Sequence, residues 1–208
     1  YVNNYYHYPA GAVQELGLCR FDRLHDFTVK KNQILLMPTW RMYIRNELMN
    51  EPGKKQDEQF METDYYKYWD GILKQKEFLD LIEKNKLQVV FYPHREMHPF
   101  LHCFHVKHPN IRVASWPEDD VQELLKESAF LVTDYSSVAM DFAYMKKPLL
   151  YYQFDNEKFR SSHHAPGYLD FKTEGFGPVC ETPEQVVETL CESYAHGFAN
   201  EKKYLDRH

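Results

Sequence analysis

The sequence predicts an α/β protein with a parallel sheet covered by helices on both faces, and three observations lead to this fold class. From residue 34 onward, short β-type runs alternate with longer helical stretches. Most of the short runs are continuously apolar, as expected of strands that are buried on both faces. Hydrophobic residues make up 43 % of the 208-residue chain, which is enough to build a packed interior and excludes a disordered or fibrous protein. This length favours one domain over two.

Six short runs are the candidate strands, and the stretches between them supply the helices. In chain order the strands are Ile34 to Met37, Gln88 to Tyr92, Ile111 to Ala114, Phe130 to Thr133, Leu149 to Tyr152 and a weak one near Val179. An apolar stripe on residues 71–84 predicts one helix, and an apolar face after the acidic pair Asp119-Asp120 predicts another. The best marked helix begins at Thr182-Pro183-Glu184-Gln185, where a capping hydroxyl, a first-turn proline and a glutamine occur together. Residues 51–58, rich in Lys and Glu, are expected to form an exposed loop.

Charge and cysteine content exclude several classes of protein. With 25 Lys and Arg against 31 Asp and Glu, the formal net charge of −6 argues against a bulk electrostatic grip on nucleic acid or anionic lipid. The apolar runs are far shorter than the roughly 18 residues of a membrane-spanning helix. The four cysteines are too widely spaced for a Cys-x-x-Cys pair and favour a reducing, cytoplasmic compartment. The first residues resemble no signal peptide and suggest a piece of a longer protein.

Polar side chains follow three of the predicted strands. Pro38-Thr39-Trp40-Arg41 follows the first, Pro93-His94-Arg95 the second, and Asp134-Tyr135-Ser136-Ser137 the fourth. In open α/β sheets, ligands bind beyond the carboxyl ends of the strands, where loops meet helix N-termini. We therefore expect these three segments to form a cradle for a phosphate ester.

The segment around Asp134 is the most informative of the three. A buried strand ends there, and Ser136 and Ser137 open a helix whose free N–H groups favour an anion such as a diphosphate. Serine is also a preferred N-cap, so a purely capping role is equally open, and the two roles are compatible. Asp141, inside the apolar start of that helix, either contacts a ligand hydroxyl or faces water.

His94 and Arg95 emerge together at one strand end, an arrangement often used to recognise phosphate. The alternative is an ordinary loop histidine beside a solvated arginine. Nearby, His98 and His102 would share a helix face, but the acid is misplaced for the zinc-protease motif and Pro99 would interrupt a helix. We therefore expect no metal site, and no cofactor is required.

Two aromatic features have competing interpretations. Trp40 is expected to pack under its loop while Thr39 and Arg41 bind phosphate. The dense segment Tyr65-Tyr66-Lys67-Tyr68-Trp69 suggests a contact surface, although internal packing or packing against a partner domain is the alternative. With net negative charge and no basic interleaving, it is not a nucleic-acid platform.

The same residues carry a resemblance to a known family. Residues 17–24, 37–41, 92–95 and 132–143, then the Lys147-Pro148 segment with Asp155 following, resemble the ordered motifs of the CDP-glycerol glycerophosphotransferases, the teichoic acid polymerases and their relatives. The block Thr133-Asp134-Tyr135-Ser136-Ser137 with Lys147-Pro148 close behind is the specific part. The resemblance covers roughly residues 17 to 180, and Cys19 and Arg95 depart from the family pattern.

This resemblance implies that residues 1–208 form the Rossmann-like, donor-nucleotide-binding C-terminal half of a two-domain GT-B transferase, with 1–30 as an interdomain segment. The implied donor is CDP-glycerol or a similar CDP-polyol, and the implied acceptor is a lipid-linked polymer at the inner face of a bacterial membrane. The base that activates the acceptor belongs to an N-terminal domain. His94 is the catalytic candidate at the diphosphate, and the donor-binding candidates are Thr39, Arg41, His94, Arg95, Asp134, Ser136, Ser137 and Asp141.

Two other functions remain open at this point. A GT-B nucleotide-sugar glycosyltransferase or epimerase would use similar strand ends with a different donor. A non-catalytic domain would instead recruit a partner through residues 65–69. Glycerol and ribitol phosphate are not distinguished by the sequence.

Overall fold

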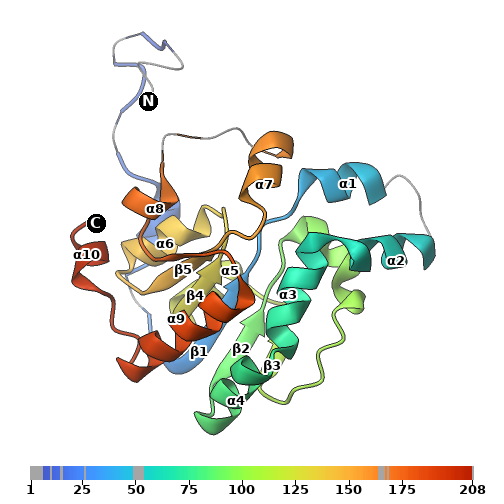
Figure 1. The fold of residues 1–208 in the computed structure, drawn as a ribbon. Coiled ribbons are helices and arrows are strands. Elements are labelled where there is room, and N and C mark those ends of the chain that lie inside the picture. The colour runs from blue at the N-terminus through green and yellow to red at the C-terminus, as the bar shows by residue number, and fades with distance from the viewer. Residues whose placement is uncertain are drawn as a thin grey trace.

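Six parallel strands form one sheet in the order β3-β2-β1-β4-β5-β6, with helices on both faces (Figure 1). The computed structural model describes residues 7–9, 11–14, 16–25, 27–48, 54–163, 167 and 169–207. The strands are β1 Lys30–Met37, β2 Gln88–Phe91, β3 Ile111–Val113, β4 Ser128–Thr133, β5 Leu149–Tyr152 and β6 Val179–Cys180. The chain builds outward from β1 to β3, then returns to β1 and adds β4 to β6 on its other side. The predicted fold class is confirmed, and β1 and β4 each begin earlier than the sequence indicated.

Helices connect the strands and cover the sheet. The α-helices are α1 Met42–Leu48, α2 Lys54–Glu62, α3 Asp64–Lys74, α4 Lys76–Lys84, α5 Val121–Glu127, α6 Val138–Tyr144, α7 Asn156–Ser162, α8 Phe171–Glu174, α9 Pro183–Ala195 and α10 Lys202–Leu205. Two 3-10 helices, η2 Cys19–Arg23 and η3 Arg95–Cys103, complete the described elements. None of the described helices is long and apolar enough to cross a membrane.

The two faces of the sheet bury two separate hydrophobic clusters. Along β1, Ile34 and Leu36 point to one cluster, and Leu35 and Met37 point to the other, as the two-residue period of a strand requires. The first cluster packs under α3, α4 and α9, the helices on the near face in Figure 1. The second packs under α5 and α6. Continuous apolar strands therefore arise because both of their faces are covered.

Two segments differ from the sequence-based expectation. The stripe on residues 71–84 belongs to two helices, because Gln75 is extended (φ −65°, ψ 128°) and ends α3 while beginning α4. Both helices bury their apolar residues in the same cluster, so the stripe continues across the break. The expected loop over 51–58 is wrong for residues 54–58, which form the start of α2, and its first three residues lie outside the described part of the chain.

The predicted helix starts at Asp120 and Thr182 are confirmed. The Asp120 carboxylate accepts the Glu123 N–H at 2.9 Å, and Thr182 with Gln185 forms a complete capping box on α9.

At the C-terminal end of α5, buried Lys147 donates to the carbonyls of Leu125 and Lys126 at 2.5 and 2.9 Å. Burial lowers the pKa of Lys147 to about 7. Lys147, which directly precedes Pro148 and β5, thus ties the C-terminal end of α5 to the segment that leads into the sheet.

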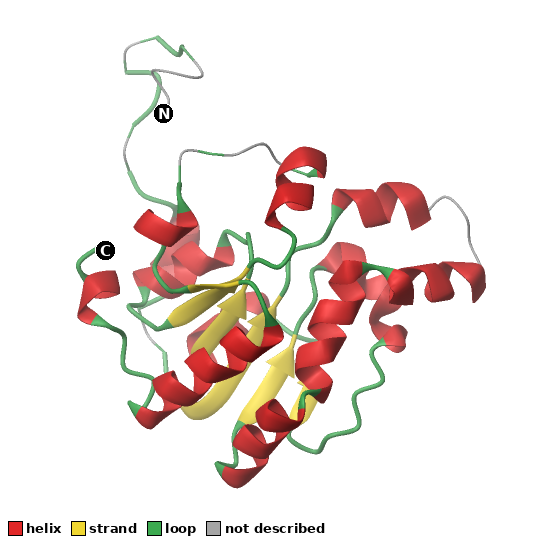
Figure 2. Cartoon of the chain, viewed as in Figure 1, coloured by secondary structure: helices red, strands yellow, loops and turns green. Residues whose placement is uncertain are grey.

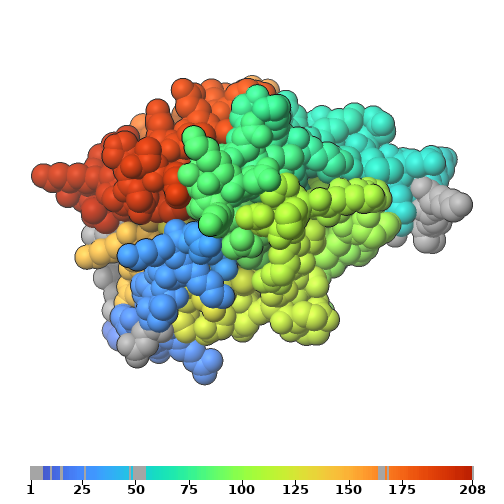
Figure 3. Space-filling model, turned by 90° about the horizontal axis from the view of Figure 1, so that it is seen from below, coloured from blue at the N-terminus to red at the C-terminus, as the bar shows by residue number. Residues whose placement is uncertain are grey.

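The edge of the sheet where the strands begin differs from the edge where they end. Figure 3 views the edge at which the strands begin, where the blue start of β1 lies beside the green end of α4. There Asn32 Nδ2 donates to the Lys86 carbonyl at 3.0 Å, and Lys30 pairs with Glu127. Both contacts involve exposed side chains. The polar segments singled out from the sequence lie at the opposite edge, where the strands end.

Candidate functional site

The carboxyl ends of β2, β1 and β4 lie next to one another at one edge of the sheet, as the sequence predicted (Figure 2). The strand order reverses between β1 and β4, which is the point where parallel α/β sheets bind their ligands. Hydrogen bonds join the three loops. The His94 N–H donates to the Pro38 carbonyl at 3.2 Å, and the Thr39 N–H donates to Asp134 Oδ1 at 2.9 Å. The loop after β1 therefore bridges the other two.

Arg41 occupies the centre of this edge as a completely buried cation. Its Nε and Nη2 bind both oxygens of Asp155 at 2.7 and 3.0 Å, and Nη1 binds Asp134 Oδ2 at 2.9 Å. Nη1 also donates to the Thr39 carbonyl at 2.7 Å. Burial opposes the charge, but the two carboxylates outweigh it and hold the pKa of Arg41 above its usual value. One guanidinium thus connects the loops after β1, β4 and β5.

Four aromatic rings surround the Arg41 guanidinium. Their centroids lie 5.1 to 5.6 Å from its central carbon, and they belong to Tyr65, Tyr135, Phe154 and Phe159. Burial, followed by the Asp155 charge, raises the pKa of Tyr135 well above its usual value. The cation is therefore enclosed by rings as well as by carboxylates.

The burial of Arg41 and Asp134 differs from the sequence-based expectation that both contact a ligand. Neither has exposed surface, and they bind each other. The remaining oxygen of Asp134, Oδ1, accepts the N–H groups of Thr39 and Tyr135. Their donors and acceptors are used in contacts that hold the loops in place. Thr39 lies beside them with its Oγ1 buried and without a hydrogen-bond partner among the described residues.

His94 stands at the N-cap of η3 and is exposed. Its Nδ1 accepts the Glu96 N–H at 3.2 Å, and its ring lies over Trp40 with centroids 6.2 Å apart. Desolvation of the imidazole lowers the pKa of His94, so the neutral form is favoured near pH 7. Because Nδ1 is an acceptor, the proton of the neutral ring lies on Nε2. His94 therefore presents an N–H donor at this edge.

Arg95 turns toward the end of β3. Its guanidinium carbon lies 4.1 Å from the ring centroid of Trp116, a side chain that is 52 % exposed. The Trp116 indole and the guanidinium of Arg95, the residue after His94, thus form a stacked pair. Trp40 is half-buried and packs edge-on against His163, which agrees with its expected place under the loop.

Ser136 and Ser137 lie at the start of α6, and neither hydroxyl makes a short hydrogen bond that caps the helix. Ser137 occupies the N-cap position, but its side chain caps no backbone N–H. Ser136 Oγ accepts the Val138 N–H at a long 3.4 Å. The capping alternative is therefore wrong for Ser137 and weakly met by Ser136. Both hydroxyls remain suited to a ligand.

Asp141 is buried and forms an ion pair, which neither of its two expected roles anticipated. Its carboxylate lies 3.0 Å from the guanidinium of Arg20, which also donates to the Ser137 carbonyl. Burial raises the pKa of Asp141, and Arg20 opposes this shift. The pair lines a cavity of about 490 Å³ that extends to Trp116 and the start of α5.

Arg20 was not among the site residues that the sequence predicted. It lies in η2, far from Asp141 in the chain, and no periodic pattern links the two positions. The segment around it packs on α6, with Phe21 stacked on Tyr144 at a centroid distance of 4.6 Å and Leu24 buried in the second cluster. Its place in a family motif was the one available signal.

The aromatic segment at 65–69 packs inside the protein. Tyr65 and Trp69 have no exposed surface, and Tyr66 is buried with its hydroxyl bonded to the Cys103 carbonyl at 3.2 Å. The contact-surface interpretation is therefore wrong, and the internal-packing alternative is correct. A partner-recruiting function through this segment loses its basis.

Known proteins are similar to this chain in sequence and in fold. Residues 5–207 match the model of the family described as CDP-Glycerol:Poly(glycerophosphate) glycerophosphotransferase. The chain is 30 % identical over 207 residues to the minor teichoic acid biosynthesis protein GgaB of Bacillus subtilis (strain 168), covering 99 % of this chain and 22 % of GgaB. It is 36 % identical over 72 residues to a teichoic acid glycerol-phosphate transferase of Staphylococcus aureus (strain NCTC 8325 / PS 47), covering 35 % of this chain and 18 % of that protein.

A solved structure has the same fold. A variant of the wall teichoic acid polymerase TagF superposes with a TM-score of 0.59 at 20 % identity, over 90 % of this chain and 42 % of the TagF chain. The 208 residues thus span less than a quarter of GgaB and less than half of that TagF chain.

Proposed function

The chain belongs to the CDP-glycerol:poly(glycerophosphate) glycerophosphotransferase family, and we propose that it is the donor-binding part of a transferase in this family. The enzyme moves glycerol phosphate, or a related polyol phosphate, from CDP-glycerol to a hydroxyl of a polymer or lipid-linked acceptor. The product is a teichoic acid or a similar cell-surface polymer. Among its relatives, GgaB is a minor teichoic acid biosynthesis protein.

One observation carries the proposal: His94 and the two serines emerge from strand ends that lie on either side of β1, at the switch point of the sheet. His94 Nε2–H and the hydroxyls of Ser136 and Ser137 then donate to the diphosphate oxygens. Because α6 is only about two turns long, these side chains contribute more than its dipole does. Thr39 Oγ1, buried and without a hydrogen-bond partner among the described residues, gains a partner if the loop opens slightly toward the ligand.

Arg41 and Asp134 act in this proposal by positioning. Their ion pair, with Asp155, fixes the loops that carry Thr39 and the serines. The geometry of the edge is then set when the chain folds and needs little reorganisation on binding.

The cavity beside Asp141 suits the nucleoside of the donor. Its wall includes the half-exposed indole of Trp116, which offers a stacking face, and the Arg20–Asp141 pair, which offers donors and an acceptor to ribose hydroxyls. The cavity lies next to the start of α6, so a nucleoside placed there directs its phosphates toward Ser136 and Ser137. Arg95, stacked on Trp116, stands at its rim.

The chemistry is a displacement at phosphorus. The acceptor hydroxyl forms a new P–O bond to the glycerol phosphate, the bond to CMP breaks, and CMP leaves with the electron pair. His94 and the two serines stabilise the charge that develops on the phosphate oxygens. The base that takes the acceptor proton lies, by family resemblance, in a part of the enzyme outside these residues. The reaction then takes place at the cytoplasmic face of the membrane that holds the lipid-linked acceptor.

Isothermal titration calorimetry on the 208-residue chain tests the donor. We expect CDP-glycerol to bind more tightly than CMP, and UDP-N-acetylglucosamine to bind weakly or not at all. The His94→Ala variant loses most of this affinity, whereas His105→Ala, which changes an exposed histidine just after η3, keeps it. Tight binding of UDP-N-acetylglucosamine without binding of CDP-glycerol contradicts the proposal and favours a nucleotide-sugar enzyme.

A further inference from the structure

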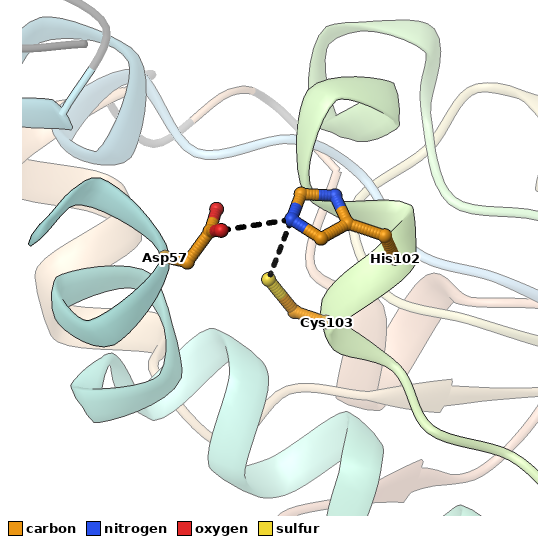
Figure 4. Close-up of side chains that lie close together, drawn as sticks. All are labelled: Asp57, His102 and Cys103. Atoms are coloured by element: carbon orange, nitrogen blue, oxygen red, sulfur yellow. Dashed lines mark hydrogen bonds and ion pairs between the residues drawn. The ribbon is translucent and has the colours of Figure 1, made fainter. Parts of the chain in front are cut away.

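Three potential metal ligands converge at the contact between α2 and η3 (Figure 4). Asp57 belongs to α2, and His102 and Cys103 are the last two residues of η3. Asp57 Oδ2 lies 2.9 Å from His102 Nε2, and Cys103 Sγ lies 3.8 Å from the same nitrogen. All three ligand atoms lie within 4.8 Å of one another.

Both partners of His102 approach a single ring nitrogen, and this distinguishes the cluster from a catalytic relay. A Cys–His–Asp relay uses the two nitrogens of the imidazole, one facing the thiol and the other the carboxylate. Here Sγ and Oδ2 both face Nε2. A neutral Nε2–H can donate to only one of these two neighbours, and the Cys103 thiol also interacts with the Asp57 carboxylate. Three donor atoms around one point instead suit a cation that binds all of them.

We propose that Asp57, His102 and Cys103 form a binding site for a divalent cation of the zinc type. Thiolate, imidazole and carboxylate together are the ligand set of Zn²⁺, and hard cations such as Mg²⁺ and Ca²⁺ do not select sulfur. Binding displaces the thiol proton to solvent and moves the imidazole proton to Nδ1. Three protein ligands leave a fourth position for water.

The distances and surroundings fit this site. Tetrahedral Zn²⁺ sets its nitrogen, oxygen and sulfur ligands about 3.3–3.6 Å apart. The pairs at 2.9 and 3.8 Å therefore shift by a few tenths of an ångström, and the Asp57–Cys103 pair, which lies within 4.8 Å, closes to the same range. The side chains of His102 and Asp57 are 61 % and 37 % exposed, which leaves an entry path, while Cys103 closes the inner side.

The two elements that carry the ligands are already held together by the core. Phe60 of α2 stacks on Phe100 of η3 with centroids 4.3 Å apart and planes within 8°. The Tyr66 hydroxyl holds the Cys103 carbonyl. A bound cation therefore adds a cross-link to a packed contact and does not have to create one.

Spectroscopic titration with Co²⁺ on the reduced, metal-free 208-residue chain tests the site. Co²⁺ replaces Zn²⁺ in tetrahedral sites and reports a bound thiolate through a charge-transfer band in the near ultraviolet. We expect this band together with the visible bands of tetrahedral cobalt, at one equivalent of metal, and we expect Zn²⁺ to abolish both. Zn²⁺ also raises the midpoint of thermal unfolding.

Matched variants decide whether the signal comes from this cluster. Cys103→Ser and His102→Ala remove the charge-transfer band or weaken Co²⁺ binding more than tenfold, while Cys191→Ser and His105→Ala, which change exposed residues outside the cluster, leave it unchanged. Circular dichroism checks that each variant is folded, and Asp57→Asn provides a further substitution at the exposed rim. Absence of the band in the parent chain, or its persistence in folded Cys103→Ser, overturns the proposal.

Discussion

The loops at the carboxyl edge of the sheet contain two kinds of polar group, and they differ in what they have left to offer. At the centre, Arg41 satisfies its donors with Asp134, Asp155 and a backbone carbonyl, and none of it is exposed. At the rim, His94 is exposed and the hydroxyl of Ser137 caps nothing. Groups of the first kind determine where the loops lie. Groups of the second kind, such as His94 and Ser137, remain available to bind a ligand.

Removing the central cation should have the largest effect, and on stability. Arg41→Met leaves the carboxylates of Asp134 and Asp155 buried without their partner, which costs about 3–5 kcal/mol of unfolding free energy. The control is Lys30→Met, which breaks an exposed ion pair with Glu127 and changes stability by less than about 1 kcal/mol. Urea denaturation measures both. Equal stability of Arg41→Met and the parent chain would show that the carboxylates do not depend on Arg41.

Removing the rim imidazole should affect binding more than stability. His94→Ala deletes a hydrogen bond to a charged phosphate, worth about 1.5–3 kcal/mol, so CDP-glycerol affinity falls about 10- to 100-fold. The unfolding free energy falls by about 0.5–2 kcal/mol, less than for Arg41→Met, because the exposed side chain gives up only its N-cap bond to the Glu96 N–H. Calorimetry and urea denaturation on one protein sample separate the two. If His94→Ala instead loses much stability and keeps its affinity, His94 has a structural role and does not bind the donor.

The serine hydroxyls should contribute less each than His94. Ser136→Ala and Ser137→Ala each remove one hydroxyl donor, and we expect the affinity for CDP-glycerol to fall about 2- to 10-fold. The control is Ser161→Ala in α7, whose hydroxyl bonds only locally to the Lys158 carbonyl. Calorimetry with the three variants ranks the effects. Identical affinities throughout would remove the serines from the site.

The smallest expected effect is a pH dependence of donor affinity. The pKa of His94 is below its ordinary value in the free protein because the imidazole is desolvated. A bound diphosphate favours the imidazolium and raises that pKa, so by linkage the affinity rises as pH falls, about two- to fivefold between about pH 7.5 and about pH 5.5. The slope disappears in His94→Asn, which keeps a donor but does not titrate. A slope that persists there belongs to another group.

The sequence predicted the groups at the rim better than those at the centre. Each rim residue follows a buried apolar run, so its position at the carboxyl edge follows from local pattern alone. The burial of Arg41 depends on Asp155, which lies 114 positions away in the chain, and no spacing rule links the two. The Arg20–Asp141 pair escaped prediction for the same reason.

Helix boundaries show the same limit in the fold. Pattern identified six strands, because continuous apolar runs suffice where both faces are buried. The same apolar pattern predicted one helix over residues 71–84, where the structure has α3 and α4. Apolar periodicity shows which face of a helix is buried, but it does not reveal a single extended residue such as Gln75. The aromatic segment at 65–69 was open to two interpretations because composition does not say whether rings pack inward or outward.

The guanidinium that joins three loops has a consequence for how donor choice can change within such a scaffold. Because Arg41 secures the backbone through its own contacts with Asp134 and Asp155, exposed residues at the same edge of the sheet, such as His94 and Ser137, can be exchanged one at a time without loss of the fold. Side chains at this edge can then diversify between members of such a family while the ion-paired triad of Arg41, Asp134 and Asp155 stays intact.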